Sequence, residues 1–223
     1  MTTASFIREI LKGKDLYRIL MNDECEKHTL AGLVADLGGG AGKPSYLRFF
    51  RQAEKTHIES VDLAVQGARH VDLEKDALPY GSETVDMILA LNVLEHIFNY
   101  NLLLSETARL LKKGGSLILV VPFLINYHPD PSDFWRYTKE TLHKLLVEKG
   151  FSEVKISALG TGPFGAGFSQ IEWMIPRFLK LLCVPLVLLG DRMVRSVKPE
   201  VTERFPLGYF VTARIGHPRQ HHV

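Results

Sequence analysis

The chain has 223 residues, of which 46% are hydrophobic and 23% charged, and 27 Lys and Arg residues nearly balance 25 Asp and Glu residues. This composition is ordinary for a folded globular protein and excludes an intrinsically disordered chain, and the length fits a single domain. The net charge of +2 is too small to indicate nucleic-acid binding by bulk charge.

The two cysteines, Cys25 and Cys183, lie far apart and have the spacing of neither a metal site nor a redox pair. They predict reduced thiols in a reducing compartment, and we expect no metal ligand set. The first 20 residues carry several charges and no apolar stretch of signal-peptide length. We therefore expect a cytoplasmic protein.

Apolar residues recur at helical spacing over residues 5–21, with a break near Gly13. The short apolar run at 33–37 predicts a buried strand that enters a glycine turn, and Pro44 suits the first turn of a helix over 45–54. The next predicted elements are strands at 57–63, 68–73 and 84–91, a helix at 102–111 and a strand at 116–121.

The second half begins with a predicted helix at 138–149, which Thr138 and Gly150 are placed to cap. The glycine-rich residues 158–170 predict either a mobile lid or a plain linker. The remaining predicted elements are a strand at 151–157, helical structure over 171–197 and a last strand at 209–215. Strands that alternate with helices indicate an α/β fold with a mostly parallel sheet.

A glycine turn between a strand and a helix start is a ligand site on physical grounds, because backbone N–H groups can approach the ligand closely. A phosphate-binding P-loop needs Ser or Thr after Gly-Lys, but Pro44 follows Gly42 and Lys43. The dinucleotide-binding fingerprint needs a small residue where Lys43 stands. Both phosphate-binding motifs are therefore disfavoured.

Four blocks in the same order resemble the class I S-adenosylmethionine-dependent methyltransferases, in particular their small type-11-like domains. The resemblance spans roughly residues 30–157. The blocks are Asp36-Leu37-Gly38 with Gly40 and Gly42, Asp62 twenty residues after Gly42, Leu78-Pro79 through Asn92-Val93-Leu94-Glu95-His96, and Glu106 through Gly114-Gly115.

This resemblance implies a Rossmann-like sheet of seven strands, mostly parallel with the last strand antiparallel, and helices on both faces. A helical insertion is expected before the last strand. We interpret residues 1–223 as one domain. Its expected parts are an N-terminal helical segment at 1–29, a cofactor-binding core at 30–157, the glycine-rich loop and insertion at 158–200, and the last strand and tail at 201–223.

The resemblance also implies S-adenosylmethionine as the cofactor and S-adenosylhomocysteine as the product. Asp36 and the glycine backbone would hold the methionine half, and Asp62 the ribose, whose two hydroxyls a carboxylate can accept from. The structural alternative is that these two carboxylates only cap turns. The implied cofactor-binding set is Asp36, Gly38, Gly39, Gly40, Gly42, Asp62, Leu63, Asp72, Leu73 and Asn92, with Glu74 and Asp76 competing with Asp72 for the adenine side.

Residues 126–138 are rich in polar and aromatic groups and resemble a stretch found in one group of the family's small members. His128 or Asp133 is a candidate catalytic base, and Arg136 could clamp an anionic acceptor, with Trp135 and Tyr137 as further substrate-binding candidates. The structural alternative pairs Asp133 with Arg136 and buries the aromatic rings. His96 is a third candidate base, or it only shapes the turn after its strand.

We therefore expect an enzyme that moves a methyl group to an O or N atom of a small-molecule or lipid- or glycan-linked acceptor by direct displacement. The alternatives are a catalytically silent module that binds the cofactor or a protein, and, less favoured, a nicotinamide-dependent oxidoreductase. We expect no nucleic-acid partner, and a monomer or a homodimer.

Residues 171–189 are apolar but have too short an uncharged run to span a bilayer. They predict a helix that covers the substrate, forms a dimer contact or lies peripherally on a membrane. The C-terminal His217, His221 and His222 belong to a basic tail, for which metal capture is a weak alternative to a solvated end.

Overall fold

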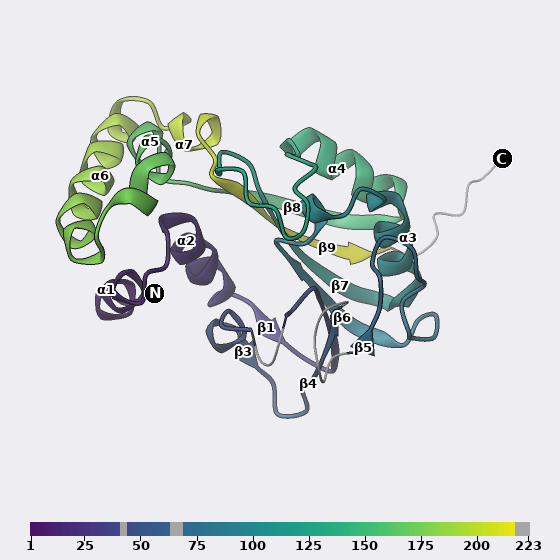
Figure 1. Cartoon of the computed structure of the whole chain (residues 1–223). Coiled ribbons are helices and arrows are strands. Elements are labelled where there is room, and N and C mark those ends of the chain that lie inside the picture. The colour runs from purple at the N-terminus through teal and green to yellow at the C-terminus, as the bar shows by residue number, and fades with distance from the viewer. Residues whose placement is uncertain (41–43, 63–68, 217–223) are drawn as a thin grey trace.

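A seven-stranded sheet lies at the centre of the molecule (Figure 1). The structure is a computed structural model that describes residues 1–40, 44–62 and 69–216. The strands run in the order β5 (Arg69–His70), β4 (His57–Asp62), β2 (Leu33–Leu37), β6 (Val85–Leu91), β7 (Leu111–Pro122), β9 (Gly208–Ile215) and β8 (Phe151–Leu159). Six of these strands have five or more residues and β5 has two.

Neighbouring strands are parallel except that β9 is antiparallel to both β7 and β8. The predicted mostly parallel α/β sheet with an antiparallel last strand is confirmed. Because these strands are parallel neighbours, the carboxyl ends of β2, β4, β6 and β7 lie at one edge of the sheet. This carboxyl edge is where open α/β sheets bind ligands.

Each buried strand divides its side chains between two hydrophobic clusters, one on each face of the sheet. Ala35 and Ile88 belong to the first cluster, whereas Val34 and Leu89 belong to the second. Successive strand residues point to opposite faces, so strands that are covered on both sides are apolar throughout. The first cluster is covered by the two predicted helices, α3 (Tyr100–Leu110) and α4 (Lys139–Glu148).

The second face is covered in part by two N-terminal helices, α1 (Thr3–Leu11) and α2 (Leu16–Cys25). The helical pattern breaks at Gly13, as predicted, where φ is +82°. The Asp15 side chain then caps α2 by accepting from Arg18 N at 2.6 Å. α2 consequently starts a new direction and reaches the carboxyl edge of the sheet.

A helical insertion between β8 and β9 is also confirmed; Figure 1 shows its helices α5, α6 and α7 grouped together at the upper left of the view. Its elements are α5 (Pro163–Ile171), the 3₁₀ turn η3 (Glu172–Met174), α6 (Arg177–Val197) and α7 (Val201–Arg204). The buried Glu172 carboxylate accepts from Leu16 N at 3.1 Å and ties the insertion to the first residue of α2. Burial raises the pKa of Glu172.

The prediction of a glycine-rich lid or linker over 158–170 is wrong for most of that segment, because Pro163–Ile171 is helix. The buried Asp191 of α6 supplies the cap that the local sequence lacks. Its carboxylate accepts from Phe164 N at 2.9 Å and from Gly165 N at 2.8 Å. A negative charge at the first amides of α5 also suits the helix dipole.

The predicted helix at 45–54 is likewise wrong. The segment forms the 3₁₀ turn η1 (Leu47–Phe49) and the short strand β3 (Arg51–Gln52), which pairs in parallel with β1 (Thr29–Leu30). The apolar side chains at positions 46, 47, 49 and 50 are all buried, a spacing that would also suit one face of a helix. Packing against the second cluster and pairing with β1 therefore override the local helical pattern.

Candidate active site

One cavity of about 610 Å³ opens at the carboxyl edge of the sheet. Its walls come from four parts of the chain: the glycine turn with residues 44–46, the end of β6 with Asn92 and His96, the loop residues 128–130, and Arg18 of α2. The glycines, Asn92 and the two histidines are candidates already identified from the sequence. The cavity brings these side chains and backbone groups together.

The glycine turn has backbone conformations that favour glycine over residues with a side chain. Gly38 has φ of +65°, and a Cβ atom there would lie 2.6 Å from Val93 Cγ2. Gly40 has φ of +69°, with nothing within 4 Å of a Cβ position. Gly40 N donates to Asp62 Oδ2 at 3.0 Å, so the acid at the end of β4 lies beside the turn. Gly42 and Leu63 lie outside the described residues.

Asp36 is completely buried at the end of β2, beneath the glycine turn. Tyr46 Oη donates to its Oδ1 at 2.6 Å. Among the described residues, Oδ2 has no hydrogen-bond partner, and a Cβ on Gly39 would approach it to 2.5 Å. Burial raises the pKa of this carboxyl to about 7. The site therefore holds a buried acid with one oxygen unused.

Asn92 follows β6 in the left-handed conformation, with φ of +56°. Its backbone N–H donates to Val120 O at 2.9 Å, which continues the pairing with β7. Tyr17 Oη, from α2, donates to Asn92 Oδ1 at 2.6 Å. The N-terminal helix is thereby attached to the edge where the candidate site lies.

Two of the candidate bases, His96 and His128, meet beside the buried Glu95. Their rings pack edge to face with centroids 5.3 Å apart. The Nε2 atom of each ring lies 3.7 Å from Glu95 Oε1, and the Glu95 side chain has no exposed surface. The Glu95 carboxylate is the main cause that raises the pKa of His128.

Asp133 and Arg136 face each other, as in the structural alternative. Arg136 donates from Nη1 to Asp133 Oδ1 at 2.5 Å and from Nη2 to Oδ2 at 2.7 Å. This bidentate pairing holds the pKa of Asp133 at about 2. His128 N also donates to Asp133 Oδ2, so the pair fixes the loop that carries His128. Neither residue is among the described residues that line the cavity.

The aromatic candidates, Trp135 and Tyr137, also have structural partners. Tyr137 is buried in the first cluster, where its hydroxyl donates to Leu94 O at 3.4 Å. Trp135 packs against the ring of Tyr100, and its Nε1 donates to Ile97 O at 3.1 Å. Their rings therefore pack against the first cluster and stabilise the loop from within.

The pair proposed for the adenine side, Asp72 and Leu73, follows β5. Asp72 accepts from Glu74 N at 2.9 Å and from Lys75 Nζ at 2.9 Å. Leu73 is buried in the first cluster. These contacts give Asp72 a capping role in a surface turn, and neither residue is among the described residues that line the cavity.

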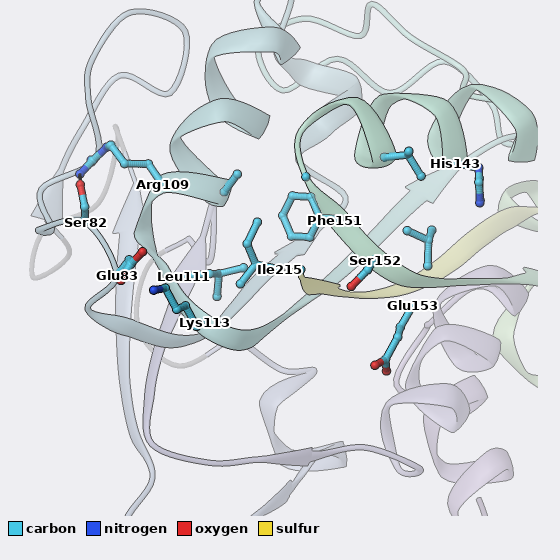
Figure 2. Close-up of a pocket in the computed structure, with 15 residues that line it drawn as sticks. Ser82, Glu83, Arg109, Leu111, Lys113, His143, Phe151, Ser152, Glu153 and Ile215 are labelled. Carbon is cyan, nitrogen blue, oxygen red and sulfur yellow. Dashed lines mark hydrogen bonds between the residues drawn. The ribbon is translucent and has the colours of Figure 1, made fainter. Parts of the chain in front are cut away.

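A larger surface depression of about 1100 Å³ lies at the opposite edge of the sheet, near the starts of β7 and β8. Figure 2 shows Leu111, Phe151 and Ile215 at its centre, with Glu153 and His143 to one side. None of the cofactor-binding, substrate-binding or catalytic candidates from the sequence lines it. Its position at the amino ends of the parallel strands also argues against a ligand site of this fold.

Sequence reasoning missed three side chains at or beside the cavity. Arg18 and Tyr46 are pocket residues, and Arg18 lies over the Tyr46 ring with Cζ 5.4 Å from its centroid. Glu95 lies in the Asn92–His96 block that resembles the family, but nothing in the sequence indicates that its side chain is buried. Arg18 lies in a helix with no recognisable site motif, so the sequence could not reveal it either.

The comparisons with known proteins decide the family. A family model described as "Methyltransferase domain" matches residues 23–154, which is more than half of the chain. This chain belongs to that family. The matched segment of the methyltransferase domain runs from α2 to β8 and contains the glycine turn, Asn92 and the histidine pair.

One named relative agrees with this assignment, and a second has no assigned function. The domain is 28% identical over 92 residues to a Mycobacterium tuberculosis protein named "Probable S-adenosylmethionine-dependent methyltransferase", covering 39% of this chain and 34% of that protein. It is 50% identical over 96 residues to an uncharacterized protein of Methanocaldococcus jannaschii, covering 40% of each. The chain thus matches well under half the length of these curated relatives.

A solved structure shows the same fold. The crystal structure of a SAM-dependent methyltransferase from Archaeoglobus fulgidus has a TM-score of 0.55 and 16% sequence identity, covering 96% of this chain and all of that one. The identity is low, so this likeness concerns the fold alone.

S-adenosylmethionine, the methyl donor of the family, fits the chemistry of the cavity. The donor carries an ammonium, a sulfonium and a carboxylate. The Asp36 oxygen without a hydrogen-bond partner suits a cationic group; it is buried beneath the glycine turn, and Asp36 is not among the described residues that line the cavity. The open space at Gly40 admits a ligand close to the backbone. Arg18, whose Nε is buried without a hydrogen-bond partner among the described residues, supplies a cation for a carboxylate.

Proposed function

We propose that this methyltransferase domain transfers a methyl group from S-adenosylmethionine to an oxygen or nitrogen atom of a small-molecule or lipid- or glycan-linked acceptor. One observation carries the proposal. The glycine turn, Asn92 and two histidines from different loops line a single cavity, and α2 closes one side of it. A donor site and proton-accepting groups therefore adjoin each other.

In this proposal Asp36 and the backbone of Gly38–Gly40 hold the amino-acid half of the donor. Asp62, beside Gly40, accepts from the ribose hydroxyls. Arg18 of α2 binds the donor carboxylate, which couples docking of the N-terminal helix to cofactor binding. Support comes from the unused oxygen of Asp36 and the buried Nε of Arg18.

The donor supplies an activated methyl group, so displacement requires no covalent intermediate with the protein. The chain's own residues align the acceptor with the methyl group and exclude water. If the acceptor must lose a proton, His96 and His128 are the bases at the cavity wall. Asp133 is unsuited to that role, because its carboxylate is held in the Arg136 pair.

An apolar stripe on the insertion supports a lipid-linked acceptor. Six large hydrophobic side chains repeat along one side of α6, each more than half exposed: Phe178, Leu182, Leu186, Leu189, Met193 and Val197. Exposed basic residues of α6, Arg177, Arg192 and Arg195, accompany this α6 stripe. Apolar and basic groups on one helix are typical of peripheral contact with an anionic membrane surface. Within the described residues, no helix is both long and apolar enough to cross a bilayer.

The direct test is transfer of a labelled methyl group from S-adenosylmethionine to acceptors presented either in water or in anionic vesicles. Label in the chloroform-extractable fraction supports a lipid-linked acceptor, and label in the water-soluble fraction supports a small one. Cofactor binding without label in either fraction would instead favour the catalytically silent module.

Vesicle flotation tests the membrane contact separately. Leu186→Glu in the α6 stripe is expected to lower the vesicle-bound fraction several-fold. Val147→Glu is the matched control, because Val147 is an exposed apolar residue of α4, outside the stripe. Equal flotation of the two variants would contradict the membrane contact.

A further inference from the structure

Glu95, His96 and His128 present hydrogen-bond acceptors to one another at the wall of the cavity. One ligand atom from each residue can be chosen so that all three lie within 4.8 Å of one another. Glu95 and His96 come from the 3₁₀ turn η2 (Leu94–His96) after β6, and His128 comes from the loop after β7. Glu95 O also accepts from Phe134 N at 2.8 Å, which holds the two loops together.

The backbone fixes the tautomer of both rings. His96 Nδ1 lies 2.5 Å from Ser132 O, and His128 Nδ1 lies 2.8 Å from Asn126 O. A carbonyl oxygen can only accept, so each Nδ1 must carry the proton. In the neutral ring the Nε2 atom is then an unprotonated acceptor, and both Nε2 atoms face Glu95 Oε1 at 3.7 Å.

With both rings neutral, no donor in the described part of the chain lies within hydrogen-bond distance of the Glu95 carboxylate. Both carboxylate oxygens of Glu95 are buried without a hydrogen-bond partner. A buried carboxylate that lacks donors costs several kcal/mol unless a cation compensates it. Three converging acceptors therefore need a positive charge among them.

We propose that Glu95, His96 and His128 bind a divalent transition-metal cation of the zinc type. Two imidazole nitrogens and one carboxylate form the ligand set of a three-residue zinc site, which leaves a fourth position open. Metal-bound histidines usually donate their other N–H group to a carbonyl or carboxylate, as both rings do here. Ligand atoms around tetrahedral zinc are about 3.3 Å apart, so modest side-chain movements complete the site.

The open position would face the cavity, because His96 and His128 both line it. A cation there would bind an oxygen of the acceptor and lower the pKa of a coordinated hydroxyl. With the cation bound, His96 and His128 would be ligands and no longer bases, so the hydroxyl proton would leave to water. The resulting oxygen would be the methyl-accepting atom. This role narrows the acceptor to an oxygen compound; it rests on the proposed methyl transfer, whereas metal binding itself does not.

The test measures metal binding directly on the full chain. His217→Ala, His221→Ala and His222→Ala are combined first, so that the tail histidines cannot bind metal. The chelator-treated protein is then titrated with Zn²⁺ against a chromophoric chelator, and with Co²⁺ by visible absorption. One ion per chain is expected. His128→Gln is expected to weaken binding more than about 100-fold and to remove the cobalt spectrum.

Glu95→Gln provides a second variant of unchanged size, and His143→Gln provides the control, since His143 is an exposed residue of α4. Zinc binding equal in the parent, His128→Gln and His143→Gln proteins would overturn the proposal. So would a parent that binds neither ion, in which case a proton shared with His128 supplies the charge. S-adenosylhomocysteine titration of the same samples separates this failure from failure of the proposed function.

Discussion

Tyr17 of α2 donates a 2.6 Å hydrogen bond to Asn92, the residue that ends β6 at the candidate site. The bond joins a helix outside the sheet to the edge where the family binds its cofactor. We expect Tyr17→Phe to lower the free energy of unfolding by about 1 kcal/mol. S-adenosylhomocysteine affinity should fall several-fold, because the Asn92 amide loses its orientation.

Urea unfolding and calorimetric titration check both effects. Tyr127→Phe is the control, since Tyr127 is 74% exposed. A Tyr17→Phe protein that matches this control in stability and in affinity would show that α2 is not coupled to the site.

The glycine turn allows a matched pair of substitutions. Gly40 and Gly114 have φ of +69° and +76°, and each has nothing within 4 Å of a Cβ position. Gly40→Ala and Gly114→Ala should therefore cost the same ~1–2 kcal/mol of backbone strain. Of these two glycines, only Gly40 lines the cavity. We expect S-adenosylhomocysteine affinity to fall at least about tenfold in Gly40→Ala and to stay unchanged in Gly114→Ala. Equal affinities would place the cofactor elsewhere.

Asp36 predicts a pH dependence of stability in the cofactor-free protein. Burial raises its pKa from 3.8 to about 7, so the folded state favours the protonated acid. Its stabilising contribution is complete below the unfolded pKa and is lost as the pH rises through about 7. From about pH 5.5 to about pH 8, wild type should lose ~2 kcal/mol relative to Asp36→Asn.

Urea unfolding at the two pH values measures this difference. Glu203→Gln serves as the control, since its exposed carboxylate should leave the wild-type pH profile unchanged. Parallel profiles for wild type and Asp36→Asn would contradict a buried acid with a raised pKa.

Substitution of Arg136 distinguishes a structural role of this residue from a substrate-clamping role. Its bidentate pair with Asp133 predicts that Arg136→Ala leaves the buried Asp133 side chain without its guanidinium partner and destabilises the fold by roughly 3 kcal/mol. The double variant Asp133→Asn/Arg136→Gln should recover part of that loss, because the uncompensated charge is gone. If Arg136→Ala instead leaves the stability unchanged and raises the KM for the acceptor, Arg136 binds the acceptor and its structural role is contradicted.

The sequence predicted the fold well because strong local signals coincide with the tertiary structure. The buried run at 33–37 became β2 without change, and Thr138 caps α4 as expected. Two segments failed for one reason. The helix expected at 45–54 and the loop expected at 158–170, most of which is α5, are both decided by distant partners, namely β1 and Asp191. Local patterns do not contain such contacts.

The candidate site was predicted less completely. The glycines, Asn92 and two histidines were found because they belong to ordered blocks and now share one cavity. Arg136, Asp133 and the nearby aromatics look like substrate groups in sequence, but their partners lie within the loop itself. The missed Arg18 comes from the N-terminal helix, whose docking against β6 depends on tertiary packing.

The most direct test of the central claim is calorimetric titration of the purified chain with S-adenosylmethionine, S-adenosylhomocysteine and NAD in parallel. Both sulfur compounds are expected to bind one per chain with micromolar affinity, and Asp62→Ala should abolish that binding. NAD should give no heat. Tight NAD binding with no response to either sulfur compound would contradict a methyltransferase site at this edge of the sheet.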